Sequence, residues 1–240
     1  MKSIIIAAGR GSRIPEFSKS IPKSLIKINK KSLLKRQIDI MRKLKIDKIS
    51  IVKGYKSNKI NFKKIKYFLN KNYKKNEQLD SLFCAKEWFK DDLIITFSDI
   101  IYDTSILKKM INSNYNFTVA IQKKWKKKYE NRFDHPIQQA DKVYVKKNNI
   151  CDIGKKLSVS KTNGEFLGII KLAKKISYKI VDEYSILRKI KKTNKLQIHD
   201  FLRYLIKKKI NIKPTYVNGK YMEIDTFNDF KIAKKIFNEK

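Results

Sequence analysis

The chain has little of several residue types, and each shortage excludes a class of protein. Its 240 residues include only 7 glycines and 4 prolines, which excludes collagen-like and linker-dominated chains. The two cysteines, Cys84 and Cys151, lack the spacing of a zinc site or a disulfide framework, and we expect both in the core. No run approaches the roughly 18 apolar residues of a membrane span, so we expect a cytoplasmic protein without a membrane partner.

Acidic residues are also scarce. The chain has 22 Asp and Glu against 58 Lys and Arg, a formal net charge of +36. Only seven of the 58 basic residues are arginine, and the 51 lysines are spread along the whole chain. Proteins that read nucleic acids favour arginine, which pairs with phosphate and guanine, so dispersed lysine indicates a compositional bias and no specific nucleic-acid partner. A basic nucleic-acid-binding protein remains the alternative, and the charge also favours small polyanionic substrates.

Hydrophobic residues make up 42% of the chain and predict an alternation of strands and helices. Residues 2–7, 49–52 and 93–97 form apolar runs typical of buried strands, and residues 33–44 have helical spacing after Ser32, a suitable N-cap. Further strands are expected over 117–122, 142–145, 166–171, 212–217 and 221–224, with helices near 79–89, 180–191, 198–208 and 229–237. This order predicts an α/β sheet covered on both faces, with ligands at the carboxyl ends of the strands.

The first expected strand opens into a glycine loop, Gly9-Arg10-Gly11-Ser12-Arg13. It differs from the dinucleotide fingerprint because the third glycine position holds Ile14, and the chain has no GxxxxGK[ST] phosphate loop. Two interpretations stay open at this point. Either the glycines let the backbone approach a nucleotide while Arg13 holds phosphate oxygens, or the loop is only a turn from strand to helix.

The residues around the loop carry a more specific pattern. Eight residues separate Arg13 from Pro22-Lys23-Ser24-Leu25. The whole pattern, A-A-G-x-G-x-R followed by P-K-x-L, resembles the signature of nucleotidyltransferases that make activated sugars and alcohols. The resemblance implies a Rossmann-like three-layer α/β fold with a mostly parallel mixed sheet, and Lys23 against the α-phosphate of an NTP. The nucleotide contacts it implies are Ala7, Ala8, Gly9, Arg10, Gly11, Ser12, Arg13, Lys23, Gln78 and Ser81.

The same resemblance gives the carboxylates a role. Asp99 looks like the metal-binding aspartate of these enzymes, and Glu223 and Asp225 look like their second acidic pair. Two residues apart on an expected strand, Glu223 and Asp225 would share one face and could hold one Mg²⁺ together with Asp99. The implied catalytic residues are Lys23, Arg13, Asp99 and Asp225. For each carboxylate the alternative is a solvated residue at the end of a strand.

Residues 77–82, 125–132, 153–155 and 164–168 resemble the phosphocholine and phosphonate cytidylyltransferases in particular. This subgroup implies one domain over residues 1–240, monomeric or homodimeric, with an acceptor-binding insertion at roughly 123–170. It would transfer CMP from CTP to a small phosphorylated amine or alcohol, or to a phosphonate, and release pyrophosphate, as in the biosynthesis of cell-surface polysaccharides. The acceptor contacts suggested by the residues are Trp125, Tyr129, Glu165 and Lys155.

One departure keeps an alternative open. Relatives that act on phosphocholine carry two asparagines where this chain has Glu77-Gln78, so a sugar-1-phosphate nucleotidylyltransferase that uses UTP, dTTP or GTP remains possible. In either reaction the attacking phosphate is already an anion and needs no general base. We therefore expect His135 and His199 to take no catalytic role.

Overall fold

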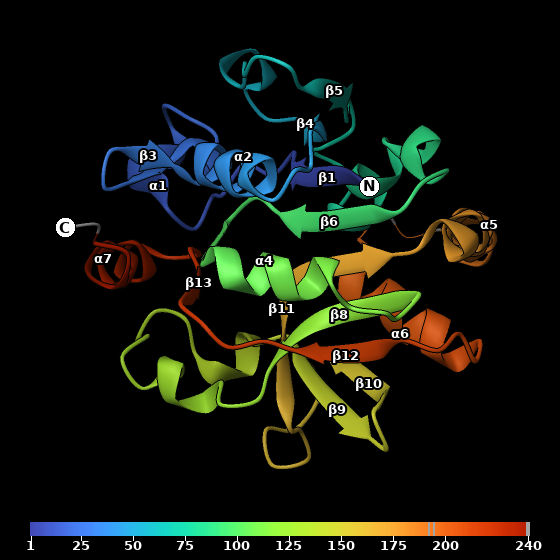
Figure 1. Cartoon of the computed structure of the whole chain (residues 1–240). Helices are drawn as coiled ribbons and strands as arrows, with labels where there is room; N and C mark the ends of the chain where they lie inside the picture. Colours follow the sequence, from blue (N-terminus) through green and yellow to red (C-terminus); the bar gives the residue numbers. More distant parts are fainter. Residues whose placement is uncertain (192, 194, 239–240) are drawn as a thin grey trace.

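The computed structural model describes residues 1–191, 193 and 195–238, and most of its strands form one sheet (Figure 1). The strands of this sheet are β1 (Lys2–Ala7), β4 (Lys48–Lys53), β5 (Lys66–Leu69), β6 (Leu93–Phe97), β8 (Phe117–Gln122), β9 (Lys142–Lys146), β10 (Asn149–Gly154), β11 (Gly164–Leu172) and β12 (Lys213–Tyr216). Their order is β10-β9-β11-β6-β1-β4-β5, with β8 paired to β11 and β12 paired to β8.

The centre of the sheet is parallel. Strand β1 pairs in parallel with β4 on one side and β6 on the other, and β4 pairs in parallel with β5. Residues 3–7 of β1 are all buried, as expected for an apolar strand that is covered on both faces. Strand β11 runs antiparallel to β6, β8 and β9. The predicted α/β fold is therefore confirmed, as a mixed sheet that is parallel in its core.

Helices cover the sheet. The helices are α1 (Pro15–Ser18), α2 (Leu33–Lys43), α3 (Gln78–Phe83), α4 (Thr104–Ile111), α5 (Lys174–Ile190), α6 (Ile198–Lys207) and α7 (Phe227–Ile236). Helices α2 and α4 contact each other on the near face in Figure 1, whereas α3 contacts β1 and α6. Ser32 caps α2 as predicted, because its Oγ accepts a hydrogen bond from the backbone N–H of Lys35 at 3.2 Å.

Strand β11 changes partners along its length. Its last residues pair with β6 and its first residues pair with β9, with a register shift against β8 between Phe166 and Ile170. Gly168 lies in this shift with φ +70°, and a Cβ there would be 2.7 Å from the Phe97 ring. Only glycine combines that backbone angle with so close a contact. The shift thus joins the parallel core to the antiparallel part of the sheet.

Two short antiparallel pairs lie beside the main sheet. They are β2 (Lys27–Ile28) with β3 (Lys31–Ser32), and β7 (Ile100–Tyr102) with β13 (Tyr221–Glu223). Strand β13 brings the C-terminal part of the chain next to the turn that follows β6. Among the described helices, none is long and apolar enough to cross a membrane.

Several local predictions were wrong. Strand β5 was not anticipated, because its side chains are only partly buried and lysine interrupts the apolar pattern. The helix expected over 79–89 ends at Phe83 and continues as a short 3₁₀ turn over Lys86–Trp88. The cysteines are not core residues either: Cys84 is half-buried and Cys151 is exposed.

Candidate active site

A cavity of about 370 Å³ opens at the carboxyl ends of β1 and β6. Because these strands are parallel neighbours, the glycine loop after β1 and the Ser98-Asp99 turn after β6 lie side by side. The cavity is lined by the predicted nucleotide contacts except Ala7, and also by residues that the sequence did not single out. The full lining is Ile6, Ala8, Gly9, Arg10, Gly11, Ser12, Arg13, Lys23, Tyr73, Lys74, Asn76, Glu77, Gln78, Ser81, Phe97, Ser98, Asp99 and Asp225.

Lys23 lies at the centre of the charged residues. It begins a short 3₁₀ turn, Lys23–Leu25, directly after Pro22. Its Nζ is 2.8 Å from Oδ2 of Asp99 and donates a hydrogen bond to Oδ1 of Asp225. Burial alone would lower the pKa of Lys23, but the carboxylates of Asp225 and Asp99 outweigh burial and hold this pKa above its ordinary value. Lys23 is therefore charged throughout the working pH range.

Asp225 is the most enclosed of the predicted carboxylates, with 2% of its surface exposed. Its Oδ2 lies 2.8 Å from the guanidinium of Arg13, on the side away from Lys23. Burial would raise the pKa of Asp225, but Lys23 and Arg13 outweigh it and lower the pKa to about 2. The structure thus brings together all four residues predicted to be catalytic, Lys23, Arg13, Asp99 and Asp225.

The acidic residues fit a hard divalent cation. Among the described residues, Oδ1 of Asp99 is buried without a hydrogen-bond partner. Glu223, Asp225 and His135 each offer a ligand atom, and these atoms lie within 4.8 Å of one another. Burial, followed by the charges of Asp225 and Asp99, raises the pKa of Glu223 well above its ordinary value. A divalent cation would relieve this repulsion, and carboxylate oxygens are the donors that Mg²⁺ prefers.

The position of Asp225 differs from the sequence prediction. Strand β13 ends at Glu223, so Glu223 and Asp225 do not share a strand face. Asp225 instead precedes Thr226, the N-cap of α7, and its backbone N–H donates to Oδ2 of Asp229 at 3.0 Å. The start of α7, and not the pleat of β13, therefore places this carboxylate.

A buried network that the sequence did not reveal supports the start of α7. Arg132 donates from Nε to Oδ1 of Asp229 at 2.7 Å. The Nη2 atom of Arg132 lies 2.7 Å from Nδ1 of His135. That Nδ1 is 3.2 Å from Asp229 and 3.7 Å from Asp225. All four side chains are almost completely buried. The sequence signal for Asp229 is the T-x-x-D capping box at 226–229, which His135 and Arg132 meet from about 95 residues away.

One wall of the cavity is held by an asparagine at the end of β5. Asn70 is 2% exposed and donates from Nδ2 to Oδ1 of Asn76 and to Oγ of Ser81, each at 2.8 Å. Its Oδ1 accepts from the backbone N–H of Asn72 at 3.0 Å. Since Asn76 and Ser81 line the cavity and Asn70 does not, Asn70 positions residues that face the cavity.

The predicted acceptor contacts lie outside this cavity. Trp125 is 1% exposed and packs edge to face on Tyr129, at 5.9 Å between ring centroids, in a small cluster of its own. The Tyr129 hydroxyl donates to Glu165, and Lys128 forms an ion pair with the same carboxylate, so the charge of Glu165 is already balanced. Lys155 is half-buried just after β10. These four positions remain predictions as acceptor contacts.

The second histidine, His199, is largely enclosed near the start of α6. His199 has 12% of its side chain exposed, and its Nδ1 lies 2.9 Å from Asp141. This contact joins α6 to the residue that precedes β9. It gives His199 a structural partner away from the cavity.

Comparison with known proteins gives the family of this chain. The sequence profile of the MobA-like NTP transferase domain matches residues 3–146, which is more than half of the chain. The protein therefore belongs to the MobA-like NTP transferase family, and it is a nucleotidyltransferase.

Individual relatives resemble the chain over different lengths. The CTP:phosphoglutamine cytidylyltransferase of Campylobacter jejuni is 28% identical over 97% of this chain and 98% of its own. The choline-phosphate cytidylyltransferase of Haemophilus influenzae is 33% identical over 51% of this chain and 54% of its own. The solved CTP:phosphocholine cytidylyltransferase of Streptococcus pneumoniae (LicC) has the same fold, with a TM-score of 0.79 at 20% identity over 99% of both chains. The chain is thus cytidylyltransferase-like in sequence.

Proposed function

We propose that the protein is a Mg²⁺-dependent cytidylyltransferase that joins the CMP of CTP to a small phosphorylated amine or alcohol, or to a phosphonate, and releases pyrophosphate. The observation that carries the proposal is the convergence of Lys23, Asp99 and Asp225 beside the glycine loop of the cavity. The similarity to the Campylobacter enzyme over nearly the whole of both chains supports CTP and a phosphorylated acceptor.

The chain's own residues account for the chemistry. An oxygen of the acceptor phosphate attacks the α-phosphorus of CTP, and the bond from that phosphorus to the pyrophosphate oxygen breaks. The attacking oxygen carries a charge already, so the protein has to hold two anions in line and neutralise the transferring group. In this proposal the backbone of Gly9 to Arg13 approaches the triphosphate, and the charges of Lys23 and Arg13 face the α-phosphate.

The metal has a defined place in this scheme. Asp99 and Asp225 would hold it, with Glu223 as the third carboxylate. When bound, Mg²⁺ would supply positive charge at the phosphate oxygens where charge develops in the transition state.

The decisive experiment is a pyrophosphate-release assay with Mg²⁺. It pairs each of the four NTPs with phosphocholine, 2-aminoethylphosphonate, phosphorylated glutamine and several sugar 1-phosphates. We expect turnover with CTP and one small acceptor, and a loss of about 100-fold or more in kcat for Asp225→Asn, because one metal ligand and the partner of Lys23 are lost together. Asp91→Asn is the matched control, since Asp91 forms an ion pair with Lys2 and does not line the cavity.

Other outcomes are equally informative. Turnover only with UTP, dTTP or GTP and a sugar 1-phosphate would replace the proposal by the sugar-nucleotide alternative. A fully active Asp225→Asn enzyme would show that Asp225 is not a metal ligand.

A further inference from the structure

Lys23 fills the space between the two carboxylates that the proposed function assigns to the metal. Its ammonium lies 2.8 Å from Asp99 and donates to Asp225, while Arg13 takes the other oxygen of Asp225 at 2.8 Å. Only 10% of the Lys23 side chain is exposed. Of the four carboxylate oxygens, Oδ1 of Asp99 is the one that has no partner among the described residues.

An ammonium and a divalent cation cannot share this position. Like charges a few ångströms apart in a poorly solvated site repel strongly, whereas either cation alone neutralises the carboxylates. Lys23 is covalently attached to the site, so its ammonium competes with free metal at a high effective concentration. A metal ion that arrives alone must therefore displace Lys23 and separate its ammonium from both aspartates.

The nucleotide provides the anion that Lys23 then needs. Lys23 lines the same cavity as the glycine loop, and a Cβ on Gly11 would lie only 2.6 Å from Cβ of Lys23. The loop and the aliphatic part of Lys23 are thus in direct contact. A triphosphate against the loop would lie next to both Lys23 and Arg13, the two cations that cover Asp225.

We propose that Lys23 holds the position of the divalent cation in the nucleotide-free protein and releases Asp99 and Asp225 only when a triphosphate binds. The metal then joins the site together with the nucleotide and not before it. The nucleotide part of this inference rests on the proposed function, but the competition between Lys23 and metal needs no nucleotide.

Mn²⁺ binding to the nucleotide-free protein, followed by electron paramagnetic resonance, tests the inference directly. We expect the wild type to bind Mn²⁺ weakly and Lys23→Met to bind it about tenfold more tightly or better, because the competing charge is gone. Lys23→Arg keeps a positive charge and is expected to bind Mn²⁺ as weakly as the wild type. Lys74→Met is the matched control, since Lys74 lines the same cavity but is not among the described residues that form an ion pair with Asp99 or Asp225.

The outcomes separate clearly. The inference is overturned if Lys23→Met keeps an intact thermal transition but binds Mn²⁺ no more tightly than the wild type does. If Lys23→Met does not fold, the wild type decides alone, because tight Mn²⁺ binding without nucleotide would equally overturn it. Absence of CTP turnover would refute the proposed function and leave this measurement valid, and a failed Mn²⁺ result would leave CTP turnover standing.

Discussion

At the scale of single residues, two glycines of the same loop have different requirements. Gly11 has φ +72°, and an added Cβ would meet the Lys23 side chain at 2.6 Å, whereas a Cβ on Gly9 would have nothing within 4 Å. The left-handed angle and the contact both disfavour any other residue at position 11. Gly11 therefore permits the close approach of the loop to Lys23, and Gly9 is free of that constraint.

Gly11→Ala should accordingly lower the melting temperature by several degrees, because the left-handed angle costs about 1 kcal/mol and the clash with Lys23 adds to it. Gly9→Ala should leave the melting temperature nearly unchanged. Thermal unfolding of both variants, followed by circular dichroism, measures the difference. Equal shifts for the two variants would show that the loop moves freely away from Lys23.

Asn70 gives a second prediction at this scale. Asn70→Asp removes the two N–H donors that hold Asn76 and Ser81, so we expect the KM for CTP to rise about tenfold with little change in kcat. Steady-state kinetics at saturating acceptor measures both constants. Asn61→Asp, at an exposed position outside the cavity, serves as the control. A fall in kcat at constant KM would contradict the proposed role of Asn70 in positioning Asn76 and Ser81 at the cavity.

At the scale of elements, the start of α7 determines where Asp225 lies. The buried ion pair of Arg132 with Asp229 fixes the capping box, and Asp229 in turn accepts from the backbone N–H of Asp225. Asp229 is completely buried, and Arg132 and His135 together hold its pKa below the ordinary range, against the effect of burial. One helix end thus connects the segment around 132–135 to the predicted metal site.

Removing Arg132 from the network with Asp229 is expected to destabilise the fold. Arg132→Met should lower the free energy of unfolding by about 3 kcal/mol or more, because it leaves the buried Asp229 without its cation. Urea denaturation measures the change. Lys35→Met, which breaks a partly exposed pair with Asp39 on α2, should cost less than about 1 kcal/mol. Comparable losses of unfolding free energy in the two variants would show that the Arg132–Asp229 pair contributes no more than a partly exposed pair.

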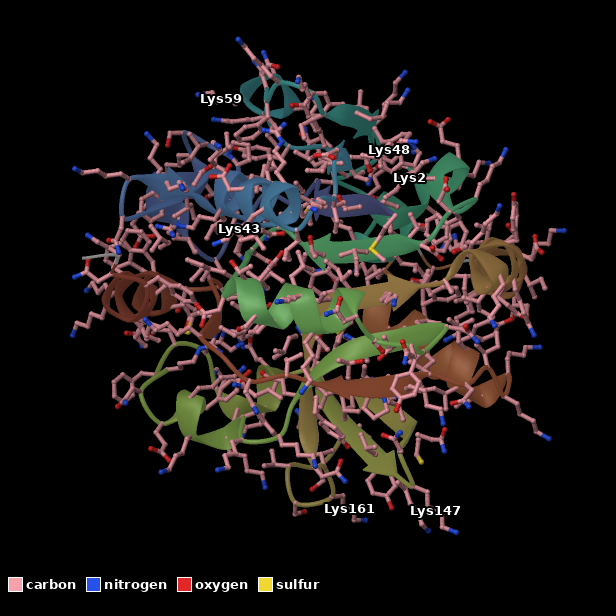
Figure 2. All side chains as sticks on the ribbon, in the orientation of Figure 1. Lys2, Lys43, Lys48, Lys59, Lys147 and Lys161 are labelled. Atoms are coloured by element: carbon pink, nitrogen blue, oxygen red, sulfur yellow. The ribbon has the colours of Figure 1, made fainter. Side chains whose placement is uncertain are left out.

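At the scale of the whole molecule, the charge of +36 comes mainly from lysines that are spread along the whole chain. Figure 2 labels lysines on well-separated parts of the molecule, toward the top, the centre and the bottom of the view: Lys2, Lys43, Lys48, Lys59, Lys147 and Lys161. A charge spread in this way raises the local concentration of any small polyanion.

The KM for CTP should therefore rise several-fold as KCl increases from low concentration to about 0.2 M, while kcat stays nearly constant, because salt screens long-range attraction. Steady-state kinetics over a KCl series checks this. Cytidine, which carries no phosphate, is the matched control and should bind with little salt dependence. The same salt dependence for cytidine would point to a general salt effect on the protein.

Much of the site follows from the sequence for local reasons. The apolar run before Gly9 requires a buried strand, Ser32 caps the helix that follows, and Asp99 stands at the end of another apolar run. Parallel pairing of such strands brings their carboxyl ends to one edge, so the glycine loop and Asp99 are predictable neighbours. Strand β5 and the role of Asn70 were missed because a strand of four residues that is only partly buried has no clear period.

What the sequence by itself determined is the class of fold, the glycine loop and the identity of the charged residues around it. These depend on patterns over a few neighbouring residues, where backbone preference and apolar periodicity suffice. Only the tertiary structure decided that Lys23 lies between Asp99 and Asp225, and that Trp125 lies in a small buried cluster. Such contacts join residues up to about 200 positions apart, and their geometry depends on how whole elements pack together.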